Sequence, residues 1–303
     1  MKSRRIFTRP ARIAAVAPYV WMALFFLVPF GFVLKIALSQ TVIAQPPYAP
    51  AFDLFGGWSA FRDGLSKLSL DNFYLLASDD IYIFSYLRSV TVALVSTLIL
   101  LVIGYPVAYA MSRLPQRWQS VTMMLVVVPF WTSFLIRIYA WINILQHDGL
   151  LNSLLLTLHI IDRPVPWLST DAAMYLGIVY SYFPFMILPL FATLSKMDGA
   201  LLEAAGDLGC SRLKAFWLVT VPLSLPGIAA GALLCFIPIA GEFVIPDLLA
   251  GSDNMMIGQT LWLEFFTNRD WPVASTIAVV LLVLLLAPLL VYEHIQRKQL
   301  ESR

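Results

Sequence analysis

Two ionisable side chains, Arg137 and Glu242, lie inside long apolar stretches of the sequence. On insertion scales each costs roughly 2.5–3.5 kcal/mol at the centre of a membrane helix, so each needs a partner or a function. Asp247 follows Glu242 closely, and carboxylates that face a pore attract cations. Two interpretations stay open. Arg137 and Glu242 form a structural salt bridge, or Glu242, together with Asp247, faces a pore and receives a cationic substrate.

A second polar stretch, residues 198–222, interrupts the apolar sequence. Asp198 can open a short helix, whose apolar stripe at i, i+4 and i+7 is formed by Leu201, Ala205 and Leu208. Gly209 suits the left-handed residue that closes such a helix. Ser211 can cap a second helix, which we expect to end by Pro222 because proline interrupts helical hydrogen bonding. The pattern predicts a helix–turn–helix elbow at a membrane surface, with an ordinary loop between two spans as the alternative.

Residues that would indicate an enzyme or a metal site are missing from the sequence. No glycine precedes a lysine, as a phosphate-binding loop requires, and no Gly-x-Ser-x-Gly turn is present. The cysteines Cys210 and Cys235 have neither the spacing nor the setting of a disulfide or metal site, and the three histidines are scattered. We therefore expect no catalytic residue, metal or cofactor, and the energy for any active process must come from a partner or an ion gradient.

The composition indicates a protein whose solvent is lipid. Of its 303 residues 60% are hydrophobic and 13% are charged, and the mean hydropathy is +0.80. Basic residues before the first apolar stretch resemble a signal peptide, but the stretch is long enough to span and no cleavage-like site follows it. We predict an all-α membrane protein with six transmembrane helices, each able to cross roughly 30 Å of hydrocarbon: 14–36, 85–111, 121–145, 171–195, 223–249 and 272–292.

The distribution of the 20 lysines and arginines predicts the orientation of these spans. Thirteen of them lie before the first span, between the second and third spans, between the fourth and fifth spans or after the last span, whereas the opposite segments clearly hold only Arg62, Lys67, Arg163 and Arg269. Cytoplasmic segments retain basic residues, so both termini and the elbow are predicted to be cytoplasmic. The chain then divides into a cytoplasmic N-terminus with the first span (1–36), an ordered outer cap (37–84), a five-helix core (85–295) and a cytoplasmic tail (296–303).

The third and fifth spans carry the two ionisable residues. If both spans are straight helices, Arg137 and Glu242 lie roughly 24–28 Å above their cytoplasmic starts, in the outer leaflet. Gly227 and Gly231 allow another helix to approach the fifth span closely, from this chain or from a partner. Bends are expected on the same span at its prolines, Pro226, Pro238 and Pro246.

The elbow resembles the coupling motif of the membrane subunits of ABC importers. The match consists of Glu-Ala-Ala at 203–205, Gly209 after three residues, and two aliphatic residues with Pro222 after nine more. Val219 and Val221 depart mildly from the usual Ile and Leu. In that family the elbow docks into the ATPase, which implies this role for Glu203, Ala204, Ala205, Asp207, Leu208, Gly209 and Pro222.

Beyond this motif, nearly the whole chain resembles the polyamine branch of these permeases. The resemblance rests on residues 131–141, 241–247 and 265–272, and Pro46-Pro47-Tyr48 is similar to the putrescine-transporting members. It implies the type I ABC importer permease fold in the inner membrane, and a substrate pathway along which Trp131 and Arg137 lie with Glu242 and Asp247. The implied partners are an ATPase dimer, a second homologous permease and a periplasmic polyamine-binding protein that delivers putrescine or spermidine. The lipid bilayer surrounds this assembly and no nucleic acid takes part.

Three alternatives to a polyamine permease remain. Within the same family, the alternative is an importer permease for another small cationic or metal-bearing solute. A secondary transporter would normally show inverted repeats with paired broken helices, and no such repeat is visible in the sequence. A membrane-embedded enzyme would need the catalytic constellation that the sequence lacks.

Overall fold

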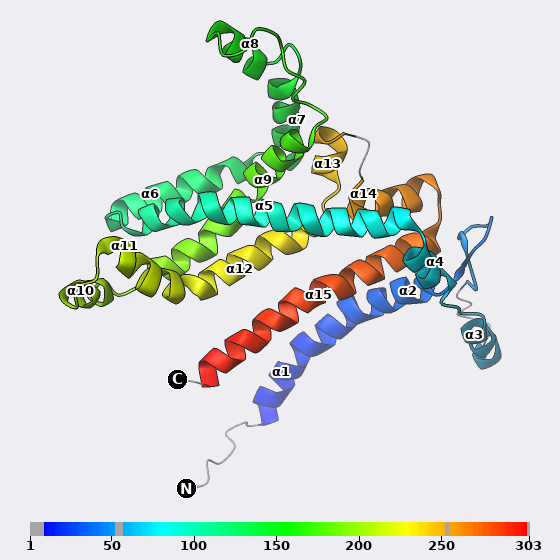
Figure 1. The fold of residues 1–303 in the computed structure, drawn as a ribbon. Helices are drawn as coiled ribbons and strands as arrows, with labels where there is room; N and C mark the ends of the chain where they lie inside the picture. Colours follow the sequence, from blue (N-terminus) through cyan, green and yellow to red (C-terminus); the bar gives the residue numbers. More distant parts are fainter. Residues whose placement is uncertain (1–8, 52–56, 252–254, 302–303) are drawn as a thin grey trace. The chain divides into compact units, whose positions relative to one another are not determined.

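The computed structural model describes residues 9–51, 57–251 and 255–301, and these are mostly helical (Figure 1). Among them, five helices are long and apolar enough to cross a membrane: Val16–Ala37, Asp80–Ser112, Asp171–Leu194, Arg212–Ala240 and Trp271–His294. The remaining expected span, the third, is a bent pair of helices, Gln116–Trp131 and Phe134–Thr157. Residues 1–8 of the expected N-terminus and 302–303 of the expected tail lie outside the described ranges.

The chain folds as two compact units, of which the first comprises Met1–Asp80 and Leu261–Leu282. Its elements are α1 (Arg9–Met22), the π-helix η1 (Ala23–Leu27), α2 (Val28–Ala37), the antiparallel strands β1 (Gln40–Thr41) and β2 (Tyr48–Ala49), α3 (Gly57–Ser66), α4 (Asp71–Ser78), the π-helix η4 (Leu263–Thr267) and the first part of α15 (Trp271–Glu301). The Asn72 amide donates to the carbonyls of Ala37 and Ser39, both at 2.8 Å, and so fixes α4 to the end of the first span. The segment expected to form a cap therefore contains two short helices and a pair of strands.

The second unit comprises Ile81–Thr260 and Val283–Arg303. Its elements are α5 (Asp80–Ser112), α6 (Gln116–Val127), the 3₁₀-helix η2 (Val128–Trp131), α7 (Phe134–Leu145), α8 (Leu150–Thr157), α9 (Asp171–Leu194), α10 (Ala200–Asp207), α11 (Arg212–Ala215), the π-helix η3 (Phe216–Thr220), α12 (Val221–Ala240), α13 (Val244–Leu249) and α14 (Ile257–Trp262). The core gathers buried aliphatic side chains from α5, α9, α12 and α13, including Leu100, Ile187, Ile239 and Leu249. A hydrogen bond of 2.8 Å between the Tyr105 and Ser224 hydroxyls also joins α5 to α12.

Small residues bring α9 and α12 into close contact. A Cβ atom on Gly227 would lie 2.5 Å from the Thr193 hydroxyl, and one on Gly231 would lie 2.9 Å from the Met186 sulfur. Neither position has room for a side chain, so the close-approach face that the sequence indicates on the fifth span is filled by a helix of the same chain.

The third span is not the straight helix that the sequence suggested. Its two halves meet at 88°. Pro129 lacks an N–H, and Thr132 and Ser133 are extended, with ψ of 151° and 138°. The Thr132 hydroxyl donates to the Pro129 carbonyl at 2.7 Å and satisfies an acceptor at the bend. The height of Arg137 inferred from a straight helix is therefore wrong.

The fifth span differs from the prediction at both ends. Its helix starts at Arg212 and runs through Pro222, because the π-helix η3 absorbs the change in hydrogen bonding: the Val221 N–H donates to Phe216, five residues back. The predicted helix end at Pro222 is thus wrong. The helix then stops at Ala240 and not at Leu249, because residues 241–243 break it before α13. Glu242 lies in this break.

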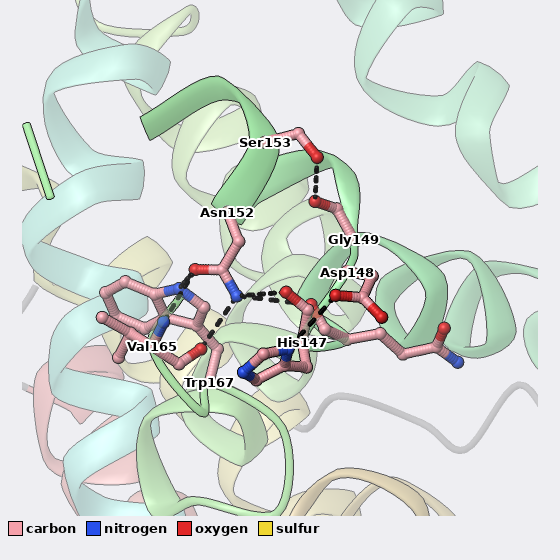
Figure 2. Close-up of polar contacts among 8 residues, drawn as sticks. His147, Asp148, Gly149, Asn152, Ser153, Val165 and Trp167 are labelled. Carbon is pink, nitrogen blue, oxygen red and sulfur yellow. Dashed lines mark hydrogen bonds and ion pairs between the residues drawn. The ribbon is translucent and has the colours of Figure 1, made fainter. Parts of the chain in front are cut away.

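A single buried asparagine organises the segment between α7 and α9 (Figure 2). The Asn152 amide nitrogen donates to the carbonyls of His147 and Val165, both at 2.9 Å, and its oxygen accepts from the Val165 N–H and the Trp167 indole. Its side chain is 1% exposed. These bonds give an ordered shape to a segment whose prolines at 164 and 166 prevent regular structure.

Candidate functional site

The carboxylate of Glu242 is held in place by three hydrogen bonds. Its Oε2 accepts from the Tyr182 hydroxyl at 2.5 Å, and its Oε1 accepts from the backbone N–H groups of Phe243 and Val244 at 3.1 and 3.0 Å. The break between α12 and α13 therefore holds a half-buried carboxylate in a fixed position.

Arg137 does not pair with Glu242. Its side chain lies on α7 and is 9% exposed, with the guanidinium carbon 4.5 Å from the centre of the Phe130 ring and 5.7 Å from that of Phe134. Across the described ranges the ion pairs are Arg88–Asp171 and His147–Asp148. The salt bridge between Arg137 and Glu242, which was one of the two interpretations of the sequence, is thus not formed. The two residues lie at similar predicted depths, but the bend at Thr132 and Ser133 keeps them apart.

An apolar cavity of about 830 Å³ lies beside Arg137. Its walls come from η2, α7, α9 and α12, and include Phe130, Ser181, Tyr182, Phe185 and Pro238. The Tyr182 side chain lines this cavity while its hydroxyl holds Glu242. Glu242 itself is not among the residues that line the cavity.

The other residues expected on the substrate pathway lie outside this cavity. Trp131 ends η2 with its side chain 77% exposed, and Asp247 is exposed on α13. Neither Trp131 nor Asp247 is among the described residues that line the cavity. Sequence reasoning missed Tyr182, because a tyrosine in a span that also contains Tyr180, Phe183 and Phe185 carries no local signal of its own.

The elbow forms as the sequence predicts in its turn and caps. Asp198 accepts a hydrogen bond from the Ala200 N–H at 3.0 Å, and Gly209 has a φ of +81°. The Cys210 N–H donates to the Ala205 carbonyl at 2.9 Å, which closes α10 in the manner of a Schellman motif. Ser211 accepts from the Lys214 N–H at 3.3 Å and caps α11.

The expected apolar stripe of the elbow is not buried as a unit. Ala205 is buried, but the Leu201 side chain is half-exposed and that of Leu208 is 88% exposed. Leu208 follows the last residue of α10, so its direction is set by the turn and not by the helical period. Glu203, Ala204, Asp207, Gly209 and Pro222 are also exposed.

More apolar side chains are exposed on the segment that follows the turn. Leu213 on α11 and Trp217 on η3 have exposed fractions of 72% and 62%. Together with Leu208 they give the elbow an apolar surface next to charged residues, which is the composition of a protein docking site. We call the exposed surface of residues 203–217 the elbow surface.

Comparisons with known proteins agree on one family. Residues 101–300 match the family described as "Binding-protein-dependent transport system inner membrane component". Spermidine/putrescine transport system permease protein PotB of Escherichia coli (strain K12) is 41% identical over 229 residues, covering 76% of this chain and 83% of that protein. The protein of the same name from Haemophilus influenzae is 40% identical over 205 residues, 68% of this chain and 72% of its own.

A solved structure shares the fold. It is the bacterial alginate ABC transporter in complex with alginate pentasaccharide-bound periplasmic protein, whose matching chain has a TM-score of 0.71 at 17% identity and covers 94% of this chain and 93% of its own. This likeness shows the type I ABC permease fold, and nothing about the solute.

Proposed function

Because this chain belongs to the family of inner-membrane components of binding-protein-dependent transport systems, we propose that it is the permease subunit of an ATP-driven importer for polyamines, putrescine or spermidine. It is a multi-pass protein of the inner membrane. Its identity to permeases named for spermidine and putrescine supports polyamines as solutes. A permease for another small cationic or metal-bearing solute is the alternative.

The proposed assembly contains three further components beside this chain. An ATPase dimer hydrolyses ATP, a second homologous permease completes the pore, and a periplasmic binding protein delivers the polyamine. A periplasmic protein is present in the solved transporter that shares this fold, which supports the last partner. The proposed orientation, with both termini and the elbow in the cytoplasm, follows from the basic residues alone.

The elbow surface is the proposed contact with the ATPase. Leu208 projects from a turn whose shape depends on Gly209 in the left-handed region, so the apolar contact and the backbone are fixed together. Glu203, Ala204, Asp207 and Pro222 lie exposed around it. A rigid elbow joined directly to α12 through η3 can pass a displacement of the ATPase to the helix that ends next to Glu242.

The observation that carries the proposed solute class is the fixed carboxylate of Glu242. Three donors hold this carboxylate in place, and one of them is the Tyr182 hydroxyl. A primary or secondary ammonium can bind such a carboxylate by charge-assisted hydrogen bonds while its methylene groups pack on aromatic rings. A polyamine alternates these two features along its length.

Uptake of labelled putrescine and spermidine tests the proposal. A strain that lacks its own polyamine importers is complemented with the operon of this permease, and separately with the operon carrying an ATPase that cannot hydrolyse ATP. We expect uptake of at least one polyamine with the first and background uptake with the second. Uptake of neither, in cells in which all subunits are present in the membrane, would contradict the assignment.

A further inference from the structure

Two buried polar side chains point to a missing partner at the cavity beside α7. The Nε and Nη1 atoms of Arg137 and the hydroxyl of Ser181 are buried and have no hydrogen-bond partner among the described residues. Both side chains line the same cavity, with exposed fractions of 9% and 4%, and the other walls are mostly apolar. Buried donors without acceptors are rare in native proteins, because leaving them unpaired is costly.

The chemistry of these two side chains defines what can occupy the site. A guanidinium only donates hydrogen bonds and keeps its positive charge, and a serine hydroxyl can donate as well. The occupant must therefore present acceptor oxygens, and a carboxylate matches the charge and the planar fork of Arg137. A polyamine carries only positive charge and no acceptor oxygen, so the proposed solute does not fit.

The nearby carboxylates of this chain are already engaged or face elsewhere. Glu242 accepts three hydrogen bonds from Tyr182 and the backbone, and Asp171 pairs with Arg88. Asp247 is exposed on α13 and lies outside the cavity wall. Glu293, which follows the lining residue Tyr292, is exposed and has an interaction of its own. Hydrocarbon tails of lipids offer no acceptor. A carboxylate of another protein chain within the membrane would satisfy these donors.

We propose that a carboxylate of the second permease subunit enters this cavity and pairs with Arg137, with the Ser181 hydroxyl as a further donor. Leu234 lines the cavity and is 51% exposed, and Ile136, which precedes Arg137 in the sequence, is 65% exposed. Exposed apolar side chains of this kind are available for contact with another membrane helix. The pair fixes the register between the two permeases. This inference rests on the proposed assembly of two permeases.

A zero-length cross-link in the complete transporter tests the pairing. Arg137→Lys keeps the charge and supplies an amine, and a membrane-permeant carbodiimide joins that amine to a carboxylate in contact with it. The reagent activates the carboxyl group and leaves as its urea when the amide bond forms. We expect a cross-link between the two permeases, with residue 137 in the linked peptide identified by mass spectrometry. Arg88→Lys is the matched control, since Asp171 of the same chain should capture it without joining two subunits.

Co-purification separates the possible failures. Arg137→Met removes the charge and should lower recovery of the second permease with this chain about tenfold or more, while Arg137→Lys should retain most of it. Co-purified permeases without a cross-link at residue 137, or a cross-link from residue 137 to Glu242, would overturn the pairing and leave the proposed function standing. Failure of the unmodified permeases to co-purify would refute the two-permease assembly, and the inference with it.

Discussion

Replacing Glu242 with Gln removes one negative charge and leaves the size of the side chain unchanged. The amide oxygen of Gln can still accept from the N–H groups of Phe243 and Val244, and the amide nitrogen can donate to the Tyr182 hydroxyl. The start of α13 should therefore be preserved. Arg137 is not the partner of Glu242, so the substitution leaves no guanidinium newly unpaired. We expect protein abundance in the membrane to stay near that of the unmodified protein.

We expect Glu242→Gln to reduce transport of the polyamine. A hydrogen bond to a charged group contributes about 1.5–3 kcal/mol, which corresponds to a decrease in polyamine uptake of about ten- to a hundredfold. Uptake of labelled polyamine, stimulation of ATPase activity by the loaded binding protein, and abundance by immunoblot are measured side by side. The matched variant Tyr182→Phe keeps the ring in the cavity wall and removes one of the three donors to Glu242, so a smaller loss, about three- to tenfold, is expected.

Two results would refute this reasoning. Full uptake at normal abundance in Glu242→Gln would exclude its carboxylate from the pathway, and a loss in Asp247→Asn in the same assay would then assign the role to Asp247. A collapse of abundance in Glu242→Gln would instead show that the charge is needed for the fold of the break between α12 and α13.

Further outcomes follow from the elbow, the outer segment and the charge distribution. Gly209→Asp should leave the protein in the membrane but reduce ATPase co-purification and uptake to background, because any side chain at a φ of +81° is strained and aspartate also adds a charge to the elbow surface; normal assembly with normal transport would contradict this. Asn152→Ala should lower the free energy of local opening by about 2–4 kcal/mol and speed limited proteolysis of residues 146–170 at least tenfold, whereas the exposed control Asn143→Ala should have little effect. Reporter fusions should indicate an outer location at Leu151 and an inner one at Gln116 and Ser211, and one reversed reporter would refute the orientation.

The sequence determined the features that depend on neighbours along the chain. Hydropathy located the first, second, fourth and sixth spans to within about five residues, because burial in lipid requires a continuous apolar helix of a given length. It misplaced both ends of the fifth span and gave no sign of the bend in the third. The start of α10 after Asp198, the cap at Ser211 and the left-handed Gly209 were also predictable, since each depends on hydrogen bonds within five residues. The coupling motif belongs to the same class of local signals.

Tertiary structure decided which side chains meet. Tyr182 and Glu242 are 60 residues apart, and they make contact because glycines 227 and 231 let α12 lie directly against α9. Arg137 and Glu242 have similar depths in the sequence, yet the bend at Thr132 and Ser133 and the break at 241–243 direct them to different partners. Helix length and hydropathy are properties of one segment, whereas the rotation, bend and separation of two helices depend on packing between residues far apart in the sequence.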